Sequence, residues 1–140
     1  MGLDMYLDLK RYYWHGEEAP TVNEAPDGFR VKYVVLEAAY WRKANAIHQW
    51  FVDNVQGGED DCHTYQVDRG IAERLVEVCK QVLDDHSKAP ELLPTTDGFF
   101  FGSTEYDESY FQDLKDTIIQ IEDALTKTSK EWFFEYHSSW

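Results

Sequence analysis

Near its start the chain reads Leu3-Asp4-Met5-Tyr6-Leu7-Asp8-Leu9-Lys10, a stretch in which every second side chain is apolar. Successive side chains of a β-strand point to opposite faces, so this alternation predicts a strand with one buried face and one exposed face. Residues 29–35 and 132–136 are rich in β-branched and aromatic residues and predict two further strands. We expect a short strand at 64–67, and the phenylalanines at 99–101 predict another over 99–104.

Helical periodicity is clearest over residues 40–55. The apolar side chains of this segment are spaced three or four residues apart, as one helix face requires: Tyr40, Ala44, Ile47, Phe51 and Val55. Two glycines at 57–58 follow, where a helix end favours glycine. The same periodicity predicts a second helix from residue 68 to about 85 and a third from about 107 to 125.

The predicted elements indicate one domain spanning residues 1–140 and the α+β class. In this fold class we expect one small antiparallel or mixed sheet packed against about three helices. Residues 15–28 contain two prolines and two glycines and predict a loop, and residues 86–96 predict a connector. Aromatic residues make up 16% of the chain, so we expect some rings to line a pocket or lie at the surface.

The chain is strongly acidic, with 27 Asp and Glu against 13 Lys and Arg and a net charge of −14. This charge argues against direct nucleic-acid binding and against an anionic membrane surface. It is compatible with a solvated surface or with imitation of nucleic acid. No apolar run approaches the roughly 20 residues of a membrane span, and the N-terminal residues lack the pattern of a signal peptide. We therefore expect a cytoplasmic protein.

Cysteine and histidine do not predict a metal centre. Cys79 falls in an apolar helical pattern and is most simply a core residue. Asp60-Asp61-Cys62-His63, with His48, offers suitable ligand types, but the spacing matches no standard zinc or calcium pattern. We predict no cofactor and no metal.

The polar side of the 40–55 segment is the first candidate site. Arg42 offers a planar set of donors suited to phosphate, and Lys43 adds a second positive charge. The remaining candidates could hydrogen-bond or stack on a base: Trp41, Asn45, His48, Gln49 and Trp50. Two structural readings compete with a site. Arg42 and Lys43 could pair with the protein's own acids, and His48 could be a satisfied core residue.

The second candidate site is the segment 95–107, at the junction with the third predicted helix. Free N–H groups at a helix N-terminus favour anions, and this segment supplies glycines, hydroxyls and rings. The residues expected to contact a ligand are Phe100, Ser103, Thr104 and Tyr106. In the competing reading, the phenylalanines pack inward and Ser103 or Asp107 simply caps the helix.

Several motifs resemble a family of small proteins encoded by tailed bacteriophages. They are Met1–Leu7, Tyr40–Val55, Asp60-Asp61-Cys62, Leu93-Pro94-Thr95, Gly98–Asp107 and Ser138-Ser139-Trp140. The resemblance spans nearly the whole chain except the 15–28 loop. It carries no activity and no catalytic residue. It implies a small viral protein acting in an infected bacterial cytoplasm, where such proteins often disarm host defence.

The leading hypothesis is therefore an anti-defence protein that acts as a sponge for a nucleotide-derived immune signal. It would bind this nucleotide-like ligand between the 40–55 and 98–107 segments without cleaving it, and a second protomer in a homodimer would close the site. A rival hypothesis is an acidic DNA mimic that inhibits a basic host protein. A third is a nucleotide-processing enzyme with His48 or Asp107 as base, which lacks a recognisable metal motif or catalytic triad.

Overall fold

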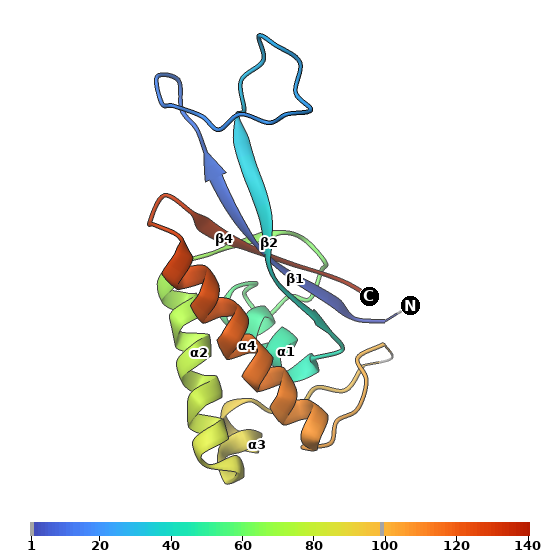
Figure 1. Ribbon diagram of the computed structural model, residues 1–140. Coiled ribbons are helices and arrows are strands. Elements are labelled where there is room, and N and C mark those ends of the chain that lie inside the picture. The colour runs from blue at the N-terminus through green and yellow to red at the C-terminus, as the bar shows by residue number, and fades with distance from the viewer. Residues whose placement is uncertain (1, 99) are drawn as a thin grey trace.

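The computed structural model describes residues 2–98 and 100–140 and has an α+β fold (Figure 1). In chain order the elements are β1 (Asp4–Tyr12), β2 (Tyr33–Arg42), α1 (Asn45–Asn54), β3 (Tyr65–Val67), α2 (Arg69–Asp84), the 3₁₀ helix η1 (His86–Lys88), α3 (Ala89–Leu92), α4 (Glu108–Lys127) and β4 (Phe133–Ser139). The four strands form an antiparallel sheet in the order β2-β1-β4-β3. The sequence predicted an antiparallel or mixed sheet, and the structure shows that it is antiparallel.

Strand β1 decides the architecture because it pairs with β2 on one side and β4 on the other. Met5 and Leu7 of β1, and Leu3 just before it, are fully buried, while the intervening residues are partly exposed. Burial of each such side chain stabilises the fold by about 1.5–3 kcal/mol. The alternation seen in the sequence therefore corresponds to a strand with one face in the core.

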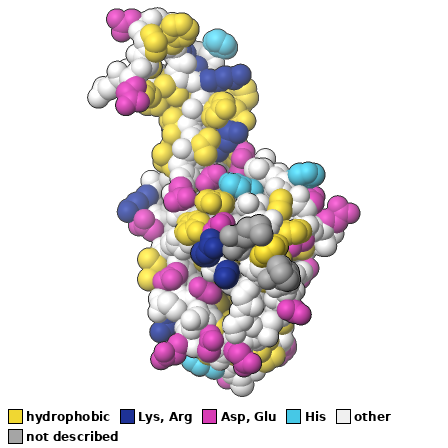
Figure 2. Space-filling view, turned by 90° about the vertical axis from the view of Figure 1, so that its right-hand side faces the viewer, with side chains coloured by type: hydrophobic (Ala, Val, Ile, Leu, Met, Phe, Trp, Pro, Cys, Tyr) yellow, Lys and Arg dark blue, Asp and Glu magenta, His cyan; other side chains and the backbone are white. Residues whose placement is uncertain are grey.

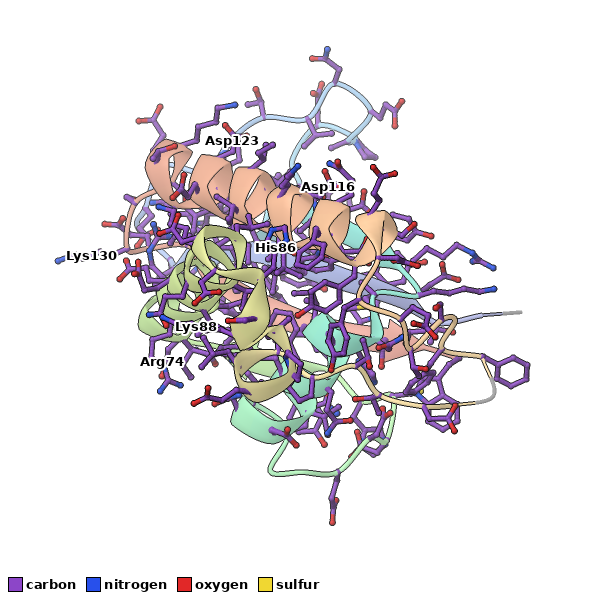
Figure 3. All side chains as sticks on the ribbon, turned by 90° about the horizontal axis from the view of Figure 1, so that it is seen from below. Arg74, His86, Lys88, Asp116, Asp123 and Lys130 are labelled. Atoms are coloured by element: carbon purple, nitrogen blue, oxygen red, sulfur yellow. The ribbon has the colours of Figure 1, made fainter. Side chains whose placement is uncertain are left out.

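The helices cover the buried face of the sheet. From α1, Phe51 stacks on Tyr136 of β4 with ring centroids 4.0 Å apart. From β2, Trp41 donates a hydrogen bond through Nε1 to Thr117 Oγ1 of α4 at 2.8 Å. Helices α2 and α4 lie side by side (Figure 1), and His86 stacks on Phe111 at 3.8 Å between η1 and α4 (Figure 3). None of the helices in the described residues is long and apolar enough to cross a membrane.

The hairpin of β1 and β2 extends beyond the helices as a projecting arm (Figure 1). We use "arm" for residues 10–37. Its connecting loop is held by Arg30, whose guanidinium donates hydrogen bonds to the carbonyl oxygens of Tyr13, Trp14 and Glu17. The arm exposes several large apolar side chains on its surface: Trp14, Val22, Phe29, Tyr33, Val35 and Leu36.

The boundaries of two predicted elements differ from the structure. The helix predicted over 40–55 begins at Asn45, and Tyr40, Trp41 and Arg42 belong to β2. Pairing with β1 determines the conformation here, because Trp41 lies opposite Met5 and is buried on the sheet's inner face. Correspondingly, the strand predicted over 29–35 begins at Tyr33 and runs ten residues to Arg42.

The strand predicted over 99–104 is absent from the described part of that segment. Residues 100–104 form a turn and irregular backbone, and Phe99 lies outside the described residues. Three adjacent rings suited a strand, but Phe101 packs edge-on against His48 and Trp140 in the core. The remaining strands and the two long helices lie close to their predicted positions.

Candidate ligand-binding pocket

A cavity of about 370 Å³ opens where β2 ends, α1 begins and α4 begins. Its basic side is formed by Arg42 and Lys43, and its opposite side by α4 and the loop before it. The pocket thus joins parts of the two segments that the sequence indicated. Figure 2 shows a few Lys and Arg side chains on the body among many Asp and Glu side chains.

Arg42 is already engaged by a neighbouring carboxylate. Its Nη1 lies 2.8 Å from Asp4 Oδ1, and the Tyr40 hydroxyl donates to the same oxygen. The hydrogen bond from Tyr40 lowers the pKa of Asp4, and Arg42 lowers it further. The Arg42 side chain is nevertheless 48% exposed. An anionic ligand would therefore share or compete for this guanidinium.

Lys43 occupies the corner between β2 and α1 in a left-handed conformation, with φ of 57°. Its backbone is held on both sides: its N–H donates to Leu3 O at 2.7 Å, and its carbonyl accepts from Asn45 N at 3.0 Å. A left-handed conformation costs a non-glycine residue roughly 1 kcal/mol or more, and such strain is found preferentially at functional sites. Among the described residues, no ion pair joins Lys43 to a carboxylate.

Two glycines leave the space that the Lys43 side chain occupies. A Cβ on Gly102 would lie 3.1 Å from Lys43 Cβ, and a Cβ on Gly2 would lie 3.0 Å from Lys43 Cε. The side-chain stem is therefore packed closely while the residue remains exposed. This packing limits the directions that the ammonium group can take.

The opposite wall carries carboxylates and hydroxyls. Asp107 accepts a hydrogen bond from Tyr110 N at 3.0 Å and so caps α4. Asp113, in the second turn of α4, is half-buried. Burial, followed by the nearby charges of Asp116 and Asp107, raises the pKa of Asp113 to about 7. Near neutral pH its carboxyl group therefore exists in both protonation states and can donate as well as accept a hydrogen bond.

Asn45 lines the pocket, and both of its Nδ2 hydrogens and one acceptor position of its Oδ1 are already used. Its Nδ2 donates to Phe101 O at 3.0 Å and to Ser103 O at 2.9 Å, and its Oδ1 accepts from Thr96 N at 2.9 Å. The side chain is 4% exposed. These bonds tie the 95–103 loop to the first turn of α1, so the role that the geometry supports is positioning.

His48 lies in a separate, buried network. Its Nδ1 lies 2.6 Å from the Tyr136 hydroxyl, and its Nε2 lies 2.9 Å from Asp60 Oδ2. Burial raises the pKa of Tyr136, so its hydroxyl keeps a proton that it can donate to Nδ1. In the tautomer with its proton on Nε2, His48 donates to Asp60, which also accepts from Trp140 Nε1 at 3.1 Å. Both ring nitrogens are satisfied, and the side chain is fully buried.

The other predicted site residues around α1 fall outside the pocket. Trp41 and Trp50 are 3% and 9% exposed and pack in the core. Gln49 donates to Asp53 at 2.8 Å and lines a second hollow of about 390 Å³. Phe100 also lines that hollow, beside Trp140.

The residues predicted around 103–106 surround the pocket or support it. Ser103 lines it and accepts a hydrogen bond from Glu105 N at 3.0 Å. The Thr104 carbonyl accepts from Thr95 Oγ1 at 2.8 Å, and the Tyr106 hydroxyl accepts from Thr95 N at 3.3 Å. These contacts fix the loop rather than direct either side chain into the pocket.

Ser109 and Asp113 line the pocket from α4 and lie outside both candidate segments that the sequence indicated. Asp113 belongs to an acidic helix, but its side chain lines the pocket. The signal was present in the helical spacing, because Asp113 follows the buried Tyr110 by three residues and precedes the buried Leu114. The outer side of α4 carries Asp116 and Asp123 (Figure 3).

The 60–63 loop forms local contacts. Asp61 accepts hydrogen bonds from the Tyr65 hydroxyl and from His63 N, and the Cys62 side chain is exposed. No group of three or more His, Cys, Asp or Glu within the described ranges is arranged to hold a metal ion.

Comparisons with protein-family models, with curated proteins and with solved structures found no match for this chain.

Proposed function

We propose that this protein binds a nucleotide-like, phosphate-bearing small molecule in the pocket beside Lys43 and holds it without cleaving it. The resemblance to bacteriophage proteins extends this proposal to a biological role: removal of a nucleotide-derived immune signal in an infected cell.

The observation that carries the proposal is the pairing of a cationic corner with a carboxylate and hydroxyl wall. Lys43 has no ion-pair partner among the described residues, and Arg42 lies beside it. Two adjacent cations match a phosphate group. Carboxylates such as Asp107 and Asp113 can accept hydrogen bonds from ribose hydroxyls, as acidic residues do in dinucleotide-binding proteins.

The arrangement favours binding over catalysis. His48, the base that a nucleotide-processing enzyme could use, is fully buried and hydrogen-bonded through both ring nitrogens. Asp107 already accepts the hydrogen bond that begins α4. A catalytic base must reach the proton that it removes, and His48 lacks that access.

The proposal is tested by mixing the pure protein with ADP-ribose and a cyclic dinucleotide, measuring binding by native mass spectrometry, and recovering each compound after denaturation. We expect at least one compound to bind and to be recovered intact. Lys43→Ala should weaken its binding at least about tenfold. Lys115→Ala removes the same charge from an exposed position on α4 outside the pocket and should leave binding nearly unchanged. Absence of nucleotide binding, or recovery of cleaved product, would contradict the proposal.

The acidic outer side of α4 favours a second candidate, a decoy for a basic protein. Asp116 and Asp123 lie along this side (Figure 3), and Ile119 between them is 67% exposed. Binding of this kind should fall steeply with salt and should be lost in Asp116→Asn with Asp123→Asn, whereas Lys43→Ala should not affect it. The two candidate functions therefore respond to different substitutions.

A further inference from the structure

We propose that two copies of this chain pair in antiparallel fashion along the free edge of β2, with Val35 of one copy opposite Val35 of the other. The proposal rests on the arm and is independent of the pocket beside Lys43.

The first observation is the contrast between the two edges of the sheet. In the order β2-β1-β4-β3, both β2 and β3 are edge strands. Strand β3 has three residues, whereas β2 has ten. Natural proteins usually protect a long edge strand, because its unpaired N–H and C=O groups can pair with another chain.

The hydrogen-bond pattern identifies which groups of β2 are available. Tyr13 donates to Lys32 O, so the pair 13 and 32 is hydrogen-bonded within the hairpin. Such pairs alternate along an antiparallel ladder, and the odd-numbered residues Tyr33, Val35 and Glu37 therefore direct their backbone groups outward. Within the described residues, none of these three N–H groups donates a hydrogen bond to a side chain or to a loop.

The other end of the same edge is already protected. The outward N–H of Tyr40 donates to Gln120 Oε1 of α4 at 3.0 Å. A register irregularity between Leu7 and Asp8 also interrupts the regular pairing near residue 38. The segment open to a partner strand is therefore 33–37, on the projecting arm.

Apolar side chains flank this segment on both faces. Tyr33, Val35 and Leu36 are 47%, 47% and 48% exposed, although β-branched and aromatic residues usually pack against cross-strand neighbours. Figure 2 shows hydrophobic side chains gathered along the arm, in contrast to the acidic body. An edge of this kind favours burial against another strand.

A second copy fits the segment because the sequence is self-complementary about Val35. In this register Val34 lies opposite the partner's Leu36, and Tyr33 lies opposite the partner's Glu37. Outward-facing residues meet outward-facing residues, as the ladder requires, and no charged residue of 33–37 lies opposite itself.

The local charge also permits two strongly acidic chains to meet here. Residues 29–40 contain Arg30, Lys32 and Glu37, which gives a formal charge of +1 in a chain of −14. The paired segments therefore add little electrostatic repulsion between the two acidic chains.

The first test is the oligomeric state by sedimentation velocity across a range of concentrations. We expect a dimer in the original protein and an increase of at least about tenfold in its dissociation constant in Val35→Lys, which places like charges opposite each other. Ile119→Lys is the matched control, because it makes the same type of change at another exposed apolar position. A monomer at every concentration, or a dimer equally affected by both substitutions, would overturn the proposal.

The second test measures the register. In a Cys62→Ser background, which removes the exposed native thiol, Val35→Cys should form an interchain disulfide on mild oxidation. Glu37→Cys should not, because in this register the two introduced thiols would lie four residues apart along the strands, or about 13 Å. Equal crosslinking of both variants, or pairing with a different protein strand in place of a second copy, would exclude the register. Circular dichroism confirms that each variant is folded.

Discussion

One group of polar side chains surrounds His48 within α1, and another surrounds Lys43 at the corner just before α1. The two groups differ in whether their side chains are accessible to a ligand. The His48 network is buried, and both ring nitrogens are used by Tyr136 and Asp60. The Lys43 corner is exposed and has a cation without an ion pair in the described chain. Residue type alone therefore does not identify a site. Histidine can act as an acid, a base or a metal ligand, but here it is buried, whereas the lysine is exposed to a ligand.

The largest expected loss of stability comes from a substitution in the buried His48 network. His48→Ala leaves a cavity and removes the partner of both the Tyr136 hydroxyl and the Asp60 carboxylate. We expect the free energy of unfolding to fall by about 3–5 kcal/mol. Urea denaturation measures this change. Ligand affinity of the molecules that remain folded should be nearly unchanged, and a selective loss of affinity with full stability would assign His48 to the site.

Asn45→Ala tests the connection between the two groups. It removes three hydrogen bonds to the 95–103 loop, so the free energy of unfolding should fall by about 2–3 kcal/mol. Unlike His48→Ala, it should also weaken ligand binding, because the loop positions one wall of the pocket. Calorimetric titration of the variant measures the second effect, and unchanged affinity would show that the loop is held by other contacts.

The fold was more predictable than the pocket. Leu3, Met5 and Leu7 alternate with polar residues because alternate side chains of a strand share one face, which here is buried. This local pattern is enough to predict the strand. The spacing from Tyr40 to Val55 misled because Tyr40 and Trp41 fit a helix face by chance, while pairing with β1 is a long-range interaction that a local pattern does not contain.

The site residues were less predictable for a related reason. Arg42 and Lys43 were selected for their charge, and they do line the pocket. Local sequence does not reveal that Asn45 hydrogen-bonds a loop about fifty residues further along the chain. It also does not reveal that Asp113 lines the pocket. Both properties depend on how α4 docks beside α1.

Asp113 provides a pH-dependent test of the pocket beside Lys43. Its pKa is raised to about 7, above the value of about 4 in an unfolded chain, so the folded protein holds the proton more tightly. The stabilisation is present below pH 4 and is lost as the pH rises to 7. Asp113→Asn should remove this dependence and raise the free energy of unfolding at pH 8 by about 1–2 kcal/mol, allowing for partial exposure.

Measurement of that free energy between pH 4 and 8 in both proteins provides the comparison. In the original protein, affinity for a phosphate-bearing ligand should also increase below pH 7, because a protonated Asp113 repels phosphate less. Parallel stability curves for the two proteins would contradict the assigned pKa.

The smallest effect on stability is expected at Lys43. Lys43→Gly relieves the left-handed conformation and should change the free energy of unfolding by no more than about 1 kcal/mol, with an increase as the expected sign. Ligand binding should nevertheless weaken at least about tenfold. Thermal denaturation and calorimetric titration separate the two effects. A large loss of stability would make Lys43 a structural residue.

Lysine side-chain NMR tests most directly whether the Lys43 ammonium group meets the ligand. ADP-ribose and a cyclic dinucleotide are added in turn to protein labelled at the lysine side chains, with Lys43→Ala used to assign the signal. The account predicts that a bound nucleotide shifts the Lys43 signal while that of Lys115 stays in place. A nucleotide that binds and leaves the Lys43 signal unmoved would contradict it.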